Sequence, residues 1–169
     1  MYPLLHQTPT EILARDFAAT AHATQMYGDA PYVRHLEDVV GVLKEFHLSD
    51  PLVSAGWLHD VLEDTPVQES DLTRIFPSAI VRLVAAVTGV GINRTARVAC
   101  IYDRLQQTPE AVPLKLADRV ANGTRSRAGS PVKYARYVKE YPEFRSRLLP
   151  LSASAGTMWA RLDGLFLAA

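Results

Sequence analysis

At the centre of the sequence stands Trp57-Leu58-His59-Asp60-Val61-Leu62-Glu63-Asp64-Thr65, in which a His-Asp pair and a Glu-Asp pair fall within six positions. The surrounding residues 52–62 are apolar except for Ser54 and the His-Asp pair. A helix that is apolar on nearly every side is expected to be buried. Charged side chains on a buried helix are costly unless they are paired or bind a metal ion. Because the three carboxylates would repel one another, the stretch predicts a cation site.

The spacing of these groups predicts how a helix would present them. On one continuous helix His59 and Glu63 would share a face, and the two aspartates would share the neighbouring face. We expect this helix to begin at residues 49–51, where Asp can cap and Pro suits the first turn. It should end before Pro66, which cannot continue a helix.

The length of 169 residues predicts a single domain over residues 1–169, with a core of about residues 10–125 and C-terminal helices in residues 130–167 packed on it. The single cysteine, Cys100, excludes an intramolecular disulfide and a thiolate-rich zinc site. No apolar run reaches the roughly 20 residues that cross a membrane, and no signal-peptide pattern opens the chain. We therefore expect a soluble cytoplasmic protein with no membrane partner.

Charge is divided unevenly along the chain. Residues 1–75 carry 12 acidic and 4 basic side chains, and residues 76–169 carry 6 and 14, so the halves bear −8 and +8. Either the halves neutralise each other on folding, or the first half holds a cation while the second meets an anion such as a phosphorylated substrate. The net charge of zero argues against nucleic acid as a partner, and an oligomer is compatible with the sequence.

Helical periodicity predicts an all-α fold, and no segment shows a useful period of two or a β-hairpin signal. The helix after Pro131 should be interrupted or kinked at Pro142. The expected helices cover about residues 11–26, 36–46, 51–64, 70–76, 79–88, 94–107, 109–122, from 131 onward, and 152–167.

Two more residues could complete a metal site with His59 and Asp60. His35 stands at the entry to a helix, and Asp118 lies on the polar side of an otherwise apolar helical run over residues 112–122. Taken alone, His35 is better explained as a cap or core group, and Asp118 as an ion-pair partner of Lys115 or Arg119; only the set of four favours metal ligation. Together the four supply two imidazoles and two carboxylates, a set that suits Mn²⁺, Fe²⁺, Zn²⁺ or another divalent first-row ion.

The order of these motifs resembles the HD-domain phosphohydrolases, and within them the hydrolase domain of the RelA/SpoT family and its small stand-alone relatives. The resemblance covers about residues 10–125 and rests on His35 and on residues 55–65, 83–88 and 114–122. It implies an HD-domain helical bundle that holds a metal, usually Mn²⁺, through residues matching His35, His59, Asp60 and Asp118.

The resemblance also implies a reaction, the removal of the 3′-pyrophosphate from the guanosine tetra- and pentaphosphates of the stringent response. The family's catalytic carboxylates match Glu63 and Asp64, and an asparagine matching Asn122 contacts the nucleoside. A solvated helix end would also explain Glu63 and Asp64, but acidic groups at a helix C-terminus oppose the macrodipole, which favours the functional interpretation.

Substrate recognition departs from the family pattern. Its adjacent basic residues after a His-x-x-Gln segment are absent here, where His22-Ala23-Thr24-Gln25 is followed by Met26-Tyr27-Gly28-Asp29. Arg94 could supply a replacement cation or could belong to an exposed helix start. Lys115 and Tyr141 are further candidates for substrate contacts, although tyrosines at helical spacing are more often packing residues.

Three functions are compatible with these residues. The first is a metal-dependent phosphohydrolase that acts on a phosphorylated nucleotide, with guanosine-3′,5′-bis(diphosphate) 3′-pyrophosphohydrolase as the specific expectation. The second is a non-catalytic module that binds or senses a nucleotide. The third is hydrolysis of another nucleotide phosphomonoester by the same site.

Overall fold

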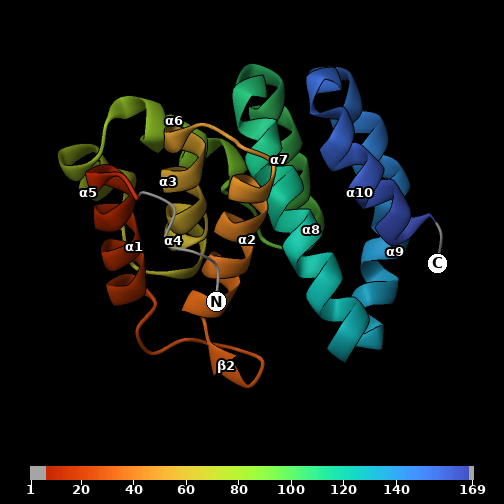
Figure 1. Ribbon diagram of the computed structural model, residues 1–169, viewed down its shortest axis with the longest axis horizontal. Coiled ribbons are helices and arrows are strands. Elements are labelled where there is room, and N and C mark those ends of the chain that lie inside the picture. The colour runs from red at the N-terminus through yellow and green to blue at the C-terminus, as the bar shows by residue number, and fades with distance from the viewer. Residues whose placement is uncertain (1–6, 168–169) are drawn as a thin grey trace.

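The computed structural model describes residues 7–167, and this part of the chain is helical apart from one very short strand pair (Figure 1). The predicted all-α class is thereby confirmed. The α-helices are α1 (Pro9–Ala21), α2 (Val33–Glu45), α3 (Asp50–Leu58), α4 (Val61–Asp64), α5 (Glu69–Ile75), α6 (Ser78–Val87), α7 (Arg94–Gln107), α8 (Val112–Gly129), α9 (Pro131–Leu148) and α10 (Gly156–Phe166). Short 3₁₀ turns cover Pro109–Ala111, Leu149–Leu151 and Ala153–Ala155.

Helix α3 lies at the centre of the N-terminal part, where it packs against α1, α2 and α6. Every residue from Val53 to Leu58 is buried, as expected of a segment that is apolar on nearly every side. Helix α2 packs in turn against α8, so α3, α2 and α8 lie side by side in that order (Figure 1). This arrangement brings three distant segments of the chain to one place.

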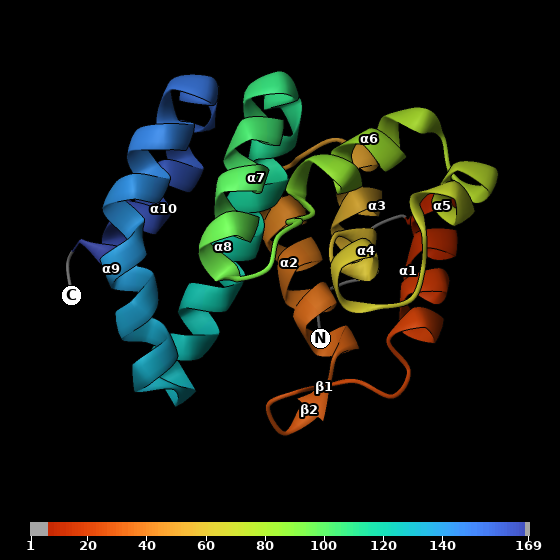
Figure 2. The ribbon, with the colours of Figure 1, turned by 180° about the vertical axis from the view of Figure 1, so that it is seen from behind.

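Helices α9 and α10 form an outer layer on α8 (Figure 2). The contact with α10 is close at Gly123, where a Cβ atom would lie 2.5 Å from both Leu165 Cδ2 and Phe166 Cζ. The buried residues of these helices belong to the same hydrophobic cluster as those of α2 and α3. The layer therefore supports the helix that carries Asp118.

The expected continuous helix over residues 51–64 is wrong, because α3 ends at Leu58 and α4 begins at Val61. His59 and Asp60 lie in the turn between the two helices. On a straight helix, neighbouring side chains would point about 100° apart. The turn instead allows both side chains to face the same point.

A second correction concerns strands. Met26–Tyr27 (β1) pairs antiparallel with Ala30–Pro31 (β2), whereas the sequence suggested no hairpin. The missed signal is the two-residue loop Gly28-Asp29, in which Gly28 adopts φ +68°. The first helix ends at Ala21, earlier than the expected residue 26, and a turn over residues 22–24 leads from it to the hairpin.

Helix α8 is longer than expected, and helix α9 is not interrupted at Pro142. Helix α8 continues past Asn122 to Gly129, because packing against α10 compensates for a poor helix former at Gly123. Helix α9 contains Pro142 and continues to Leu148. Within residues 7–167, none of the helices has the length and apolar character that crossing a membrane requires.

Candidate metal centre and adjoining pocket

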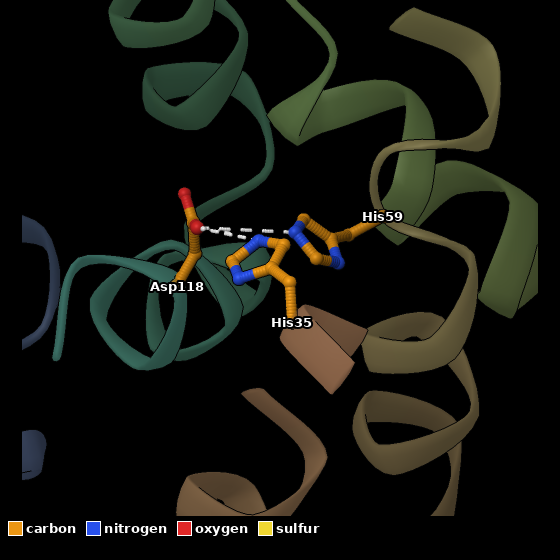
Figure 3. Close-up of side chains that lie close together, drawn as sticks. All are labelled: His35, His59 and Asp118. Carbon is orange, nitrogen blue, oxygen red and sulfur yellow. Dashed lines mark ion pairs between the residues drawn. The ribbon is translucent and has the colours of Figure 1, made fainter. Parts of the chain in front are cut away.

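Three side chains from α2, the α3–α4 turn and α8 point toward one another (Figure 3). His35, His59 and Asp118 each offer a ligand atom, and these atoms all lie within 4.8 Å of one another. The carboxylate of Asp60 joins them, with its Oδ2 3.3 Å from His35 Nε2 and 3.0 Å from His59 Nε2. The structure thus brings the four predicted ligands together, and their role as ligands stays a prediction.

The imidazole of His59 is oriented for ligation. Its Nδ1 donates a hydrogen bond to the carbonyl of Gly56 over 2.9 Å, so the neutral ring carries its lone pair on Nε2. That Nε2 atom is buried and makes no hydrogen bond with the described residues. A buried acceptor without a donor beside two carboxylates is the arrangement that a divalent cation would satisfy.

The second imidazole, His35, is held from the side by Tyr27. The two rings are stacked with centroids 4.7 Å apart and planes 18° from parallel. Its Nε2 is 3.5 Å from Asp118 Oδ1 as well as close to Asp60. The donor set of two imidazoles and two carboxylates fits a first-row divalent ion.

The electrostatics of this cluster are those of buried ion pairs. Burial alone would lower the pKa of His35, but hydrogen bonds with Asp118 and Asp60 outweigh it and raise this pKa to about 9. Burial opposes ionisation of Asp60 as well, yet the pKa of its carboxyl is lowered because His59 and His35 lie beside it. Burial opposes the ionisation of Asp118 too, but Lys115 and the two histidines lower its pKa, so both carboxylates remain charged at neutral pH and available to a cation.

The predicted catalytic carboxylates flank this cluster. Glu63 is half-buried, and its Oε2 accepts a hydrogen bond of 2.9 Å from the backbone N–H of Gly89. Asp64 is exposed, and its Oδ2 accepts a hydrogen bond of 2.9 Å from the hydroxyl of Tyr32. The same hydroxyl lies 2.6 Å from Asp60 Oδ2. Tyr32 therefore connects a predicted ligand to a predicted catalytic group.

A pocket of about 200 Å³ opens above the cluster and is lined by His35, Asp60, Glu63 and Asp118. Its walls carry five cationic side chains, namely Arg94, Arg97, Lys115, Arg119 and Lys133. The pocket is therefore acidic at its floor and basic on its walls, as a site for a cation and a phosphorylated compound would be.

Most of the wall cations are held by carboxylates. Arg94 makes two hydrogen bonds of 2.8 Å with Glu140, which also accepts a bond of 3.1 Å from Arg119. Lys115 Nζ donates to Asp118 Oδ2 over 2.9 Å. These pairs hold the charged heads in place before any ligand binds.

Three of the four predicted substrate contacts, Lys115, Arg94 and Asn122, line the pocket. The fourth, Tyr141, is wrong: it is fully buried, and its hydroxyl donates to Asp163 of α10 over 2.6 Å. One turn earlier on α9, Tyr137 does line the pocket. Helical spacing places Tyr137 and Tyr141 on one side of a helix. It does not show that the first lines the pocket and the second is buried in the core.

Several lining residues were missed as contacts, among them Tyr27, Tyr32 and Lys133. Tyr27 donates from its hydroxyl to Asn122 and stacks on His35. The only sequence signal for the two tyrosines was their position in the loop that leads from Gln25 to His35. Lys133 carried no signal, because its closeness to the hairpin arises from tertiary packing.

Residues 14–113 match a family model described as an HD domain. The chain is 30% identical to the guanosine-3′,5′-bis(diphosphate) 3′-pyrophosphohydrolase of Haemophilus influenzae, over 76% of this chain and 20% of that protein. It is 28% identical to a GTP pyrophosphokinase of Myxococcus xanthus, over 87% of this chain and 21% of that protein. The chain thus spans about a fifth of the length of these curated relatives.

A solved structure described as a metazoan ortholog of SpoT that hydrolyses ppGpp has the same fold. It superposes with a TM-score of 0.80, covers 99% of this chain and 97% of its own, and is 22% identical in sequence. At this identity the likeness establishes the helical architecture.

Proposed function

The chain belongs to the HD-domain family, and from this premise we propose that it is a metal-dependent phosphohydrolase that removes pyrophosphate from the 3′ position of guanosine 3′,5′-bis(diphosphate). The observation that carries the proposal is the floor of the pocket, where two imidazoles and two carboxylates from three segments face one point. The names of similar proteins support the choice of nucleotide.

We propose Mn²⁺ or another divalent first-row ion as the cofactor, held by His35, His59, Asp60 and Asp118. Such an ion supplies Lewis acidity to a phosphoryl oxygen and to water. The mixed nitrogen and oxygen donors support this class of ion over the all-oxygen sites preferred by Mg²⁺ and Ca²⁺.

The side chains around the proposed metal site have separate roles in this reaction. Glu63 is anchored through Oε2 by Gly89, which leaves Oε1 to accept a proton from the attacking water. Asp64 is oriented by Tyr32 and can align the same water. Arg94 and Arg119 are fixed by Glu140 and neutralise charge on the phosphoryl oxygens.

The test is a product assay on the metal-loaded protein. The chain is stripped with a chelator, loaded with Mn²⁺ and incubated with guanosine 3′,5′-bis(diphosphate), and the products are read by mass. We expect GDP and pyrophosphate, and we expect Asp60→Asn to abolish both. The variant Asp103→Asn is the matched control, because this exposed carboxylate lies on α7 outside the pocket lining.

A second variant separates chemistry from metal binding. Glu63→Gln should lower kcat by about 10²–10⁴-fold, the usual contribution of a general base, while Mn²⁺ binding by calorimetry stays unchanged. Metal-replete protein that binds the nucleotide tightly and forms no product over hours would instead select a non-catalytic sensing module. Release of phosphate from a different nucleotide would select the third function.

A further inference from the structure

Lys133 lies where two cavities meet. Together with Tyr27 it lines the pocket above the metal centre and also a second cavity of about 320 Å³. The second cavity lies between the β1–β2 hairpin and the junction of α8 with α9. Tyr27 and Lys133 thus form the boundary between the two spaces.

The ammonium group of Lys133 differs from the other cations of the pocket. Arg94 and Arg119 pair with Glu140, Lys115 pairs with Asp118, and Arg97 faces Glu63 at 3.8 Å. Within residues 7–167, Lys133 forms no such pair. It donates instead to the hydroxyl of Tyr27 over 2.8 Å and lies 4.4 Å from the centre of that ring.

A half-buried ammonium without a counter-charge is unfavourable unless a ligand supplies one. Burial accordingly lowers the pKa of Lys133. Among the residues that line the second cavity, Arg125 and Ser130, where α9 begins, add positive character, and the exposed Asp29 adds a negative charge. The charge of Arg125 is offset by Asp38 at 3.6 Å and by Asp29 at 3.9 Å, so Lys133 is the cation of this cavity that has no ion-pair partner within residues 7–167.

A chain of hydrogen bonds connects Lys133 to the metal centre. Lys133 donates to Tyr27, Tyr27 donates to Asn122, and the amide of Asn122 donates to Asp118. The free cation therefore lies three hydrogen bonds from a predicted ligand. One elongated molecule can reach both places by crossing the ring of Tyr27.

We propose that Lys133 binds the phosphate group of the substrate that is not cleaved, so that the site selects nucleotides phosphorylated at both ends. This rests on the proposed function, in which the metal centre receives the other phosphate. Lys133, and not a residue of the hairpin, fills this role because Met26-Tyr27-Gly28-Asp29 contains no cation.

The test compares two ligands that differ at one end. Guanosine 3′,5′-bis(diphosphate) carries phosphates at both ends, and guanosine 3′-diphosphate has a free 5′-hydroxyl. Binding is measured by calorimetry with Mn²⁺ in the Glu63→Gln background, so that neither ligand is consumed. Lys133→Met should weaken binding of the first about tenfold, the size of one charged hydrogen bond, and change binding of the second less than twofold.

Two variants control for charge and for folding. Lys133→Arg should keep most of the preference, because it retains the cation. Lys139→Met removes an exposed lysine of the same helix and should leave both affinities unchanged. All variants are checked by thermal unfolding, and a Lys133→Met protein with the wild-type midpoint excludes a general loss of structure.

Equal weakening for both ligands, or none for either, would overturn the proposal. Inorganic phosphate is the third probe. If the wild type binds phosphate as tightly as the bis(diphosphate), and Lys133→Met loses this binding, the site belongs to a free anion and the proposal is wrong. These measurements do not require turnover. If the protein with Glu63 intact releases no product, the proposed reaction is wrong. The effect of Lys133→Met on the two affinities still tests whether Lys133 binds the second phosphate group.

Discussion

Replacing Tyr32 by Phe should separate the alignment of Asp64 from the binding of the metal. The hydroxyl of Tyr32 lies 2.6 Å from Asp60 and 2.9 Å from Asp64, and its ring stacks on buried His22 with centroids 4.5 Å apart. Phe retains that stacking and removes only the hydroxyl. Burial and the two carboxylates raise the pKa of Tyr32, so the hydroxyl keeps its proton at every working pH.

The expected decrease in kcat follows from the hydrogen bonds that the Tyr32 hydroxyl makes. One hydroxyl proton serves two carboxylate acceptors, and a hydrogen bond to a charged group contributes about 1.5–3 kcal/mol. Asp64 is exposed, so water replaces part of the lost bond and the lower figure applies. A loss of about 1.5 kcal/mol in the transition state lowers kcat roughly tenfold. Asp60 keeps both neighbouring imidazoles, and Mn²⁺ affinity should change less than about threefold, which is under half of that energy.

The assay measures pyrophosphate release at saturating nucleotide and Mn²⁺ affinity by calorimetry. Tyr134→Phe is the matched control, because its hydroxyl donates to the backbone of Leu165 outside the pocket lining. An unchanged kcat for Tyr32→Phe would refute the idea that Tyr32 aligns Asp64. A parallel fall of kcat and Mn²⁺ affinity would refute it as well, because the lost bond would then act through Asp60.

Three further predictions concern stability and are read by urea or thermal unfolding. Gly123→Ala should cost about 1–3 kcal/mol because its Cβ would overlap α10, whereas Gly129→Ala on the same helix meets nothing within 4 Å and should be neutral or stabilising by up to about 1 kcal/mol. Asp163→Asn should cost about 1–3 kcal/mol at pH 7, because it weakens the hydrogen bond of the buried Tyr141 hydroxyl. The pKa of Asp163 is lowered by Arg145, so this contribution is complete above the ordinary carboxyl pKa of about 4 and is lost as pH falls below it, and the difference from wild type should shrink at pH 3. Mn²⁺ at a hundredfold excess over its Kd should stabilise the protein by about 2.7 kcal/mol, and Asp118→Asn should reduce that gain.

The local properties of the chain predicted much of the fold. Residues 52–58 are apolar on nearly every side, and they form the buried α3. A helix was expected over residues 94–107, and α7 covers Arg94–Gln107 with the side chain of Asn93 accepting from the N–H of Ala96 at its start. Such features depend on a few neighbouring residues, which is why periodicity and capping rules identify them.

Features that depend on tertiary contacts were missed. The turn at His59 and Asp60 interrupts a segment that is otherwise largely apolar and carries no Gly or Pro at the turn, and it accompanies the approach of both side chains to α2 and α8. Helix α8 passes through Gly123 because α10 packs there. Tyr137 and Tyr141 share a helix and a residue type, yet only the first lines the pocket. The local sequence pattern of a helix does not show which other element packs against each of its sides.

The close approach of α10 to Gly123 limits how far this protein can be trimmed for crystallography or display. A fragment reduced to the matched segment 14–113 would lack Asp118, one of the four proposed metal ligands. A fragment that ended after α9 would keep Asp118. It would lack Trp159, Leu162 and Phe166, which are buried residues of α10, the helix that packs against α8. We expect such a fragment to expose an apolar helix face and to aggregate, although every residue proposed to contact the nucleotide would still be present.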